Sequence, residues 1–164
     1  MRDCTEFADF YAATGPRIMG QVYLMVGDRG EAEDAVAEAY ARAWQRWDVV
    51  SGYADPAAWV RTVAYRTAVS SWRRAMRRRR AHDQARGVLT VPGPGPDNAA
   101  LLDALGQLPA AQRQAIVLHH LAGLSVAEIA SETGSSDSAV KARLARGRAV
   151  LAALLDDTKE NTRA

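Results

Sequence analysis

The sequence contains a single cysteine, Cys4, and no long run of apolar residues. One cysteine cannot form an internal disulfide, and no apolar run approaches the roughly 20 residues that a helix needs to cross a bilayer. Residues 1–9 are acidic and mixed, so they lack the basic start and apolar stretch of a secretory signal. We therefore expect a protein of the reducing cytoplasm that makes no membrane contact.

The sequence also lacks the residue patterns of enzymatic and metal sites. His119 and His120 are adjacent, so on a helix they point about 100° apart and cannot share a metal ion without distant ligands. His82 lies alone among arginines, and Cys4 has no histidine near it in the sequence. The glycines of segment 87–97 alternate with prolines and cannot cradle a phosphate. We expect no cofactor, no metal and no enzymatic activity.

Apolar residues are plentiful, because 48% of the 164 residues are hydrophobic, which is enough to form a core. Segment 87–97, GVLTVPGPGPD, has three prolines and three glycines, which break helices and central strands. On either side, apolar residues recur at helical spacing, with no period-two alternation. We predict an all-α fold with a helical domain over 1–80, a flexible linker over 81–98, a second helical domain over 99–158 and a tail over 159–164.

Three helix signals stand out in the first half. The stripe of Phe7, Phe10 and Tyr11 predicts a helix that ends near Gly15–Pro16, before a second helix. A third helix is predicted from about Glu31 to Trp47, and its inward face is expected to comprise Ala32, Ala35, Val36, Ala39, Tyr40 and Ala43. Asp55 followed by Pro56 then predicts the start of a basic helix.

Charge is distributed unevenly along the chain. Residues 1–59 carry five arginines and ten acidic residues, whereas residues 60–86 carry nine arginines and one aspartate. An acidic module followed by a basic stripe favours one surface for a basic protein partner and another for a polyanion. The alternative is that the arginines between Arg73 and Arg80 only solvate a helix face.

Aromatic residues are interleaved with this basic stripe. The residues concerned are Trp59, Arg61, Tyr65, Arg66, Trp72, Arg73 and Arg74. Aromatic faces contribute about 1–3 kcal/mol for each stacked base, and guanidinium groups follow the backbone, so the pattern suits single-stranded nucleic acid. Because aromatics at helical spacing usually pack in a core, we expect at least one of Trp59 and Trp72 to do so.

The second half has the pattern of a helix-turn-helix. An amphipathic stretch stops at Pro109, another helix runs to Gly123, and Ser125 with Glu128 forms a capping box before a short helix that ends at Gly134. The residues expected to face the core from the last helix are Val140, Leu144, Val150, Leu151 and Leu154. A second helix after a tight glycine turn is the helix-turn-helix arrangement.

The last helix also carries a basic face, formed by Lys141, Arg143, Arg146 and Arg148. Such a face on the second helix of the pair predicts a major-groove reader, with Ser138 and Lys141 near the helix start placed to meet base edges. The alternative is an exposed basic helix on an ordinary bundle.

The order of these parts resembles sigma factors of the extracytoplasmic-function (ECF) group, which are minimal bacterial initiation factors with two helical regions. Segment 33–44, EDAVAEAYARAW, resembles their clamp-binding helix, which docks on a coiled coil of the largest polymerase subunit. The resemblance implies polymerase contacts at Asp34, Glu38 and Arg42. Ala37 stands where a glutamine is usual in that helix.

Two further segments carry the resemblance. Residues 58–66, AWVRTVAYR, followed by Ser71-Trp72-Arg73-Arg74, resemble the segment that recognises and melts the −10 element, with Arg66 or Thr67 at the usual asparagine position. This match implies −10 contacts at Trp59, Arg61, Tyr65, Arg66, Trp72, Arg73 and Arg74. Segments LGQLP, LSVAEIA and VKARL, within 105–144, resemble the −35-reading region. They imply −35 contacts at Ser136, Ser138, Ala139, Lys141, Arg143 and Arg146.

The resemblance implies an RNA polymerase sigma factor whose partners are core polymerase and promoter DNA, with catalysis belonging to the polymerase. Many members of the group also bind an anti-sigma factor, although nothing in this sequence identifies one. Two alternatives remain open. One is a helix-turn-helix repressor or activator that acts without core polymerase. The other is a helical adaptor whose basic stripe binds RNA or an acidic protein, with salt-sensitive, sequence-blind binding.

Overall fold

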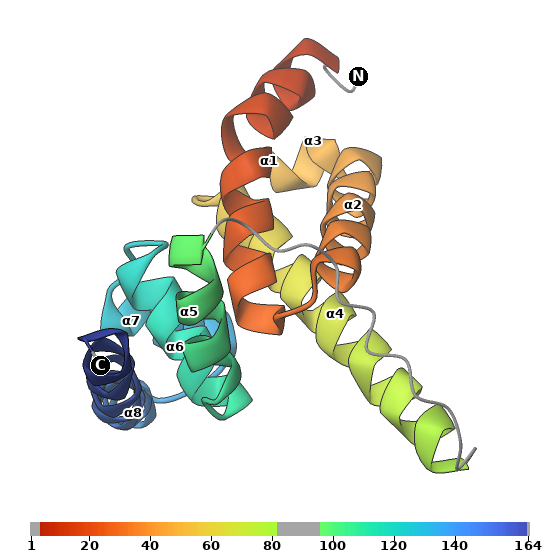
Figure 1. Ribbon diagram of the computed structural model, residues 1–164. Helices are drawn as coiled ribbons and strands as arrows, with labels where there is room; N and C mark the ends of the chain where they lie inside the picture. The colour runs from red at the N-terminus through yellow and green to blue at the C-terminus, as the bar shows by residue number, and fades with distance from the viewer. Residues whose placement is uncertain (1–3, 82–95, 164) are drawn as a thin grey trace. The chain divides into compact units, whose positions relative to one another are not determined.

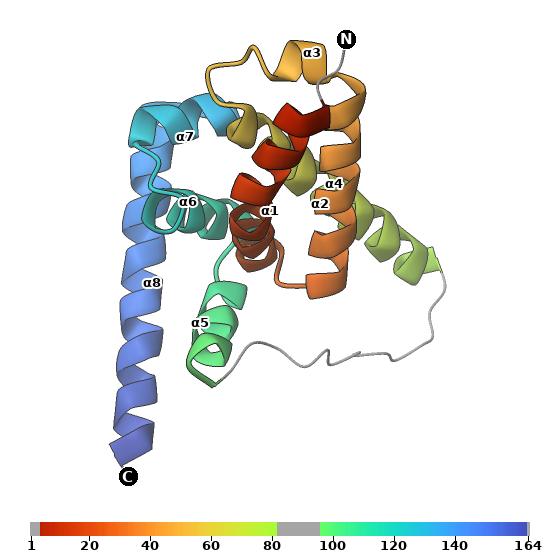
Figure 2. The ribbon, with the colours of Figure 1, turned by 90° about the horizontal axis from the view of Figure 1, so that it is seen from above.

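The computed structural model describes residues 4–81 and 96–163, and all regular structure in these residues is α-helical (Figure 1, Figure 2). The chain divides into two compact units, residues 1–92 and 93–164. The predicted all-α fold is confirmed. The expected linker over 81–98 lies largely outside the described residues, although a helix already begins at Pro96.

Unit 1 contains α1 (Cys4–Val26), α2 (Arg29–Gln45), α3 (Trp47–Val50) and α4 (Pro56–Ala81). The three long helices pack against one another, and the C-terminal part of α4 extends beyond the other two (Figure 1). Their shared core includes fully buried side chains from each helix, among them Ile18, Ala39 and Val60.

The break predicted at Gly15–Pro16 is wrong, because α1 continues through Pro16. A proline in a helix interior removes one backbone hydrogen bond and costs about 3 kcal/mol. Ile18 and Val22 follow it and are both fully buried. Each such side chain contributes about 1.5–3 kcal/mol on burial, so packing against α2 and α4 offsets the cost of the proline.

The predicted inward face of α2 is confirmed, since all six of its residues, Ala32, Ala35, Val36, Ala39, Tyr40 and Ala43, are buried. The helix begins at Arg29 rather than Glu31, because Asp28 Oδ1 caps it by accepting a hydrogen bond from the Glu31 amide at 2.8 Å. Helix α3 was not predicted. It is too short to show a helical period, and buried Trp47 and Val50 hold it against the unit.

The predicted start of α4 is confirmed, because Asp55 Oδ1 accepts a hydrogen bond from the Ala58 amide at 3.0 Å. The apolar residues that α4 buries in its first half are mostly small: Ala57, Val60, Ala64 and Ala68. Small side chains allow α4 to approach α1 and α2 closely.

Unit 2 contains α5 (Pro96–Gly106), α6 (Ala110–His120), α7 (Val126–Thr133) and α8 (Asp137–Arg163). The predicted capping box is confirmed, with Ser125 and Glu128 bonded to each other's amides, and α7 ends at Gly134 with a positive φ of 64°. A turn then leads into α8, which packs against α5, α6 and α7. Helices α7 and α8 therefore form the predicted helix-turn-helix.

One residue expected to face the core of unit 2 is exposed. Val150 is 38% exposed, whereas Val140 and Leu144 are buried as predicted. Val150 lies about 120° around the helix from Leu144, so it points away from the buried line of α8.

Candidate nucleic-acid and protein interfaces

The exposed side of α2 carries acidic and basic residues at helical spacing. Asp34, Glu38 and Arg42 are all exposed, and Arg42 Nε lies 2.8 Å from Glu38 Oε1. Arg29 and Glu33 form a second pair of the same kind at 2.7 Å. Within the described residues Asp34 has no ion pair, so its charge is fully available to a partner.

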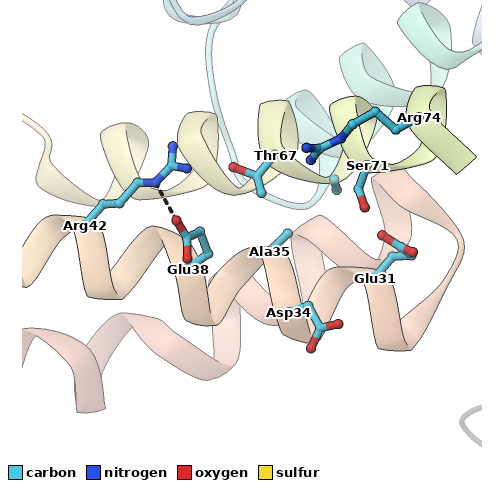
Figure 3. A pocket seen from close by; sticks show the side chains of 9 residues that line it. Glu31, Asp34, Ala35, Glu38, Arg42, Thr67, Ser71 and Arg74 are labelled. Carbon is cyan, nitrogen blue, oxygen red and sulfur yellow. Dashed lines mark hydrogen bonds and ion pairs between the residues drawn. The ribbon is translucent and has the colours of Figure 1, made fainter.

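A polar groove with a volume of about 330 Å³ runs between α2 and α4 (Figure 3). Its α2 wall holds the carboxylates of Glu31, Asp34 and Glu38. Its α4 wall holds the hydroxyls of Thr67 and Ser71, together with Arg74. Glu31, Thr67 and Ser71 were not among the predicted site residues, although the spacing of Glu31, Asp34 and Glu38 already places the three carboxylates on one side of the helix.

Helix α4 exposes three of the seven predicted −10 residues. Arg66, Arg73 and Arg74 are exposed, and Trp59 and Tyr65 are half-buried. The side chain of Trp72 lies outside the described residues. The exposed arginines form a basic face on α4 that is able to follow a nucleic-acid backbone.

Arg61 differs from the other predicted −10 residues because it is buried. Only 4% of it is exposed, and its Nη1 donates a hydrogen bond at 3.2 Å to Oε1 of Gln21 on α1, which is also 4% exposed. The structure therefore places Arg61 inside unit 1, away from the basic face of α4.

The start of α8 is held by serine hydroxyls. Ser136 Oγ accepts a hydrogen bond from the Ala139 amide at 3.2 Å and lies 3.1 Å from Ser138 Oγ. Lys141 is not part of this hydrogen-bond network, and it is exposed. Because the cap fixes the first turn of α8, the side chains that project from it are presented in a defined direction.

Two arginines of α8 make different contacts. Arg146 is exposed, whereas Arg143 Nη1 donates a hydrogen bond at 2.7 Å to Ser135 Oγ in the preceding turn. Arg143 therefore ties α8 to the turn. Of the predicted −35 residues, Lys141, Arg146, Ser136 and Ser138 are the exposed ones.

The two adjacent histidines have separate protein partners. His119 Nδ1 lies 2.8 Å from the Leu124 carbonyl, and His120 Nε2 accepts a hydrogen bond from Arg148 Nε at 3.2 Å. Burial, followed by the charge of Arg148, lowers the pKa of His120 below its usual value. The described residues contain no cluster of three or more histidine, cysteine or acidic side chains able to hold a metal ion. None of their helices combines the length and apolar character needed to cross a membrane.

Comparison with known families assigns one model to each unit. Residues 10–78 match sigma-70 region 2, and residues 98–151 match sigma-70 region 4. The ECF RNA polymerase sigma factor SigL of Mycobacterium tuberculosis is 40% identical over 129 residues, which cover 73% of this chain and 72% of SigL. The chain belongs to the ECF family of RNA polymerase sigma factors. In this sigma factor, the basic face of α4 lies in the region 2 match and the start of α8 in the region 4 match.

Two solved structures share this fold. CnrH, solved with the cytosolic domain of CnrY, is 26% identical with a TM-score of 0.68, and the match covers 94% of this chain and 90% of CnrH. RpoE of Bartonella quintana, solved with the anti-sigma factor NepR, has a TM-score of 0.79 at 24% identity, over 92% of this chain and 97% of RpoE. The fold of this ECF sigma factor is therefore also that of CnrH and RpoE.

Proposed function

We propose that this sigma factor docks on core RNA polymerase through the exposed side of α2, opens the −10 element with α4 and reads the −35 element with α8. The observation that carries the proposal is that the two family regions fall on separate units, each of which presents its own charged surface. Catalysis belongs to the polymerase in this proposal, and the sigma factor itself is not an enzyme. Its place of action is the cytoplasm, with the polymerase.

Docking on polymerase is assigned to Asp34, Glu38 and Arg42. Asp34 supplies a carboxylate that has no ion pair among the described residues, while Glu38 shares its charge with Arg42. Complementary charge accelerates the encounter and fixes the orientation of two proteins more than it adds affinity. Asp34 is accordingly the residue whose removal has the largest effect on docking.

Recognition of the −10 element is assigned to Trp59, Tyr65, Arg66, Trp72, Arg73 and Arg74. The half-buried rings of Trp59 and Tyr65 are available for stacking on unpaired bases, and the exposed arginines for phosphate contacts. Arg61 is not assigned a direct contact, because it is buried against Gln21.

Recognition of the −35 element is assigned to the first turns of α8, with Ser136, Ser138, Ala139, Lys141, Arg143 and Arg146. The N-terminal part of the second helix of a helix-turn-helix is the part that meets base edges in the major groove. Lys141 and Arg146 are exposed and suited to phosphates, whereas Arg143 keeps the turn and helix together.

An anti-sigma factor is a further proposed partner. The support is that RpoE of Bartonella quintana, which shares the fold, was solved in complex with the anti-sigma factor NepR. The chemistry that such a partner must match is the acidic side of α2 in unit 1.

The decisive experiment mixes the chain with bacterial core polymerase, follows co-elution by size-exclusion chromatography and measures start-site-specific transcription from host promoter DNA. We expect both activities in the wild type and neither in the Asp34→Arg/Glu38→Arg variant. The matched control is Asp9→Arg/Asp48→Arg, which makes the same charge change at exposed positions outside α2 and should retain both.

Failure of the wild type to co-elute would overturn the docking proposal. If it then still bound duplex DNA with sequence preference, a regulator that acts without polymerase would take its place. Salt-sensitive binding without sequence preference would instead indicate a nucleic-acid-binding adaptor.

A further inference from the structure

Arg61 and Gln21 form a buried polar contact between α4 and α1. Both residues are 4% exposed, and Arg61 Nη1 lies 3.2 Å from Gln21 Oε1. Taking a guanidinium out of water carries a large desolvation penalty, and apolar residues of similar volume at such sites are often equally stable or more stable. Stability alone therefore does not account for an arginine at this position.

The surroundings of Arg61 suggest what it contributes. The apolar residues that α4 buries beside it are Ala57, Val60, Ala64 and Ala68, and α2 faces α4 with a surface that is also rich in alanine. Small side chains at an interface allow two helices to approach closely. They provide few large interlocking side chains that would fix the rotation of one helix against the other. A directional hydrogen bond from Arg61 to α1 supplies that missing constraint.

The rotation of α4 decides where its basic face points. At about 100° per residue, Arg66 lies about 140° around α4 from Arg61, and Arg73 lies about 120° from it. Both arginines are exposed, so the buried contact of Arg61 and the basic face occupy opposite sides of one helix. A small rotation of α4 would move every side chain of that face together.

We propose that Arg61 is a positioning residue that, through Gln21, fixes the rotation of α4 and so presents its basic face to the −10 element. The inference rests on the proposed function of α4. It gives Arg61 a role in promoter opening without a contact to DNA, and it gives Gln21, which lies on another helix, the same role.

The test compares Arg61→Met, Gln21→Met and the double variant in complexes with core polymerase on host promoter DNA. Opening is measured by the permanganate reactivity of unpaired thymines, and urea unfolding and co-elution with core polymerase are measured in parallel. We expect each single variant to fold and to co-elute with polymerase, while it opens the promoter about tenfold more slowly. Gln21→Met should also lower the urea midpoint, because it leaves the buried guanidinium without this partner. The double variant should open no more slowly than Arg61→Met, because that variant already lacks the contact with Gln21.

The salt dependence of promoter binding separates positioning from direct contact. Loss of a phosphate contact reduces the slope of log affinity against log salt by about 1. Arg66→Met, which makes the same chemical change on the exposed face, is expected to reduce the slope in this way. Arg61→Met and Gln21→Met are expected to leave it unchanged.

Three results would overturn the inference. The first is a wild-type opening rate for Gln21→Met, the second is a reduced salt slope for Arg61→Met like that of Arg66→Met, and the third is slow opening that occurs only together with lost co-elution. If Arg61→Met does not fold, Gln21→Met decides alone, since it keeps the arginine. A wild type that never binds core polymerase would instead overturn the proposed function, so the two failures are distinguishable.

Discussion

Gly147 of α8 lies directly against Ile116 of α6. A Cβ at position 147 would come within 2.9 Å of Ile116 Cγ1 and 3.3 Å of its Cδ1. Glycine inside a helix is about 1 kcal/mol less favourable than alanine, so the residue is a cost to α8 itself. The close approach of α6 and α8 in the core of unit 2 explains why it is there.

Gly147→Ala should therefore destabilise unit 2. The gain in helix propensity is about 1 kcal/mol, but overpacking a well-packed contact costs about 1–3 kcal/mol, so we expect a net loss in the free energy of unfolding. Gly106→Ala, at a helical glycine with nothing within 4 Å of the new methyl group, should cause no loss. Thermal unfolding measures both, and an equally stable Gly147→Ala would contradict the packing.

Removing the hydroxyl of Thr14 should lower the stability of unit 1 more than removing the hydroxyl of Tyr40. Thr14 Oγ1 lies 2.7 Å from the Tyr40 hydroxyl and also donates a hydrogen bond to the Phe10 carbonyl. Thr14→Val leaves the buried Tyr40 hydroxyl without this partner and should cost about 1–3 kcal/mol. Tyr40→Phe leaves Thr14 its carbonyl partner and should cost less, and adding Tyr40→Phe to Thr14→Val should recover stability. Urea unfolding of the three variants gives the comparison, which additive losses would contradict.

Tyr40 should also make unit 1 sensitive to alkali. Burial raises the pKa of Tyr40 above its usual value, with the Thr14 hydrogen bond acting in the opposite direction. Because the pKa of Tyr40 is higher in the folded state, its protonated hydroxyl stabilises the folded state. This stabilisation is fully present below a pH of about 10 and is lost as the pH rises through the folded pKa. Tyr40→Phe should lose less stability than the wild type between about pH 9 and pH 11. Equal losses in urea unfolding would contradict this.

The comparison of α2 with Arg61 shows what the sequence could and could not predict. The buried face of α2 was predicted residue by residue, because its apolar residues repeat at the helical period and the polar ones fall between them. Arg61 was predicted to contact the −10 element, whereas it is buried. Its partner Gln21 is 40 residues away on another helix, so no local pattern reveals it. The continuation of α1 through Pro16 was missed for the same reason. The proline is a local signal for a helix end, but tertiary packing with other helices outweighs it.

The capping box of α7 should give unit 2 a dependence on acid. The Glu128 carboxylate accepts a hydrogen bond from the Ser125 amide at 2.7 Å, and this bond holds its pKa below the usual range. The stabilisation is therefore present above the unfolded pKa of about 4.3 and is lost as the pH falls through the lower folded pKa. Glu128→Gln keeps an acceptor but does not titrate, so the difference in melting temperature between the wild type and this variant should shrink below about pH 4. A constant difference across that range would rule out the contribution.

Lys141 and Ser135 should affect −35 recognition in different ways. Lys141 is exposed near the start of α8, so Lys141→Gln should weaken binding to all promoters and reduce the salt slope by about 1. Ser135→Ala removes no charge but frees Arg143 from its 2.7 Å hydrogen bond, so it should lower the preference for the −35 sequence at an unchanged slope. Arg148→Gln is the matched control, because it removes a charge from the same helix about 10 Å farther from the start, at a residue bonded to His120. Promoter binding by the complex with core polymerase, measured across a salt series on intact and altered −35 sequences, separates these effects. Equal slopes for the wild type and Lys141→Gln would place the phosphate contact elsewhere on α8.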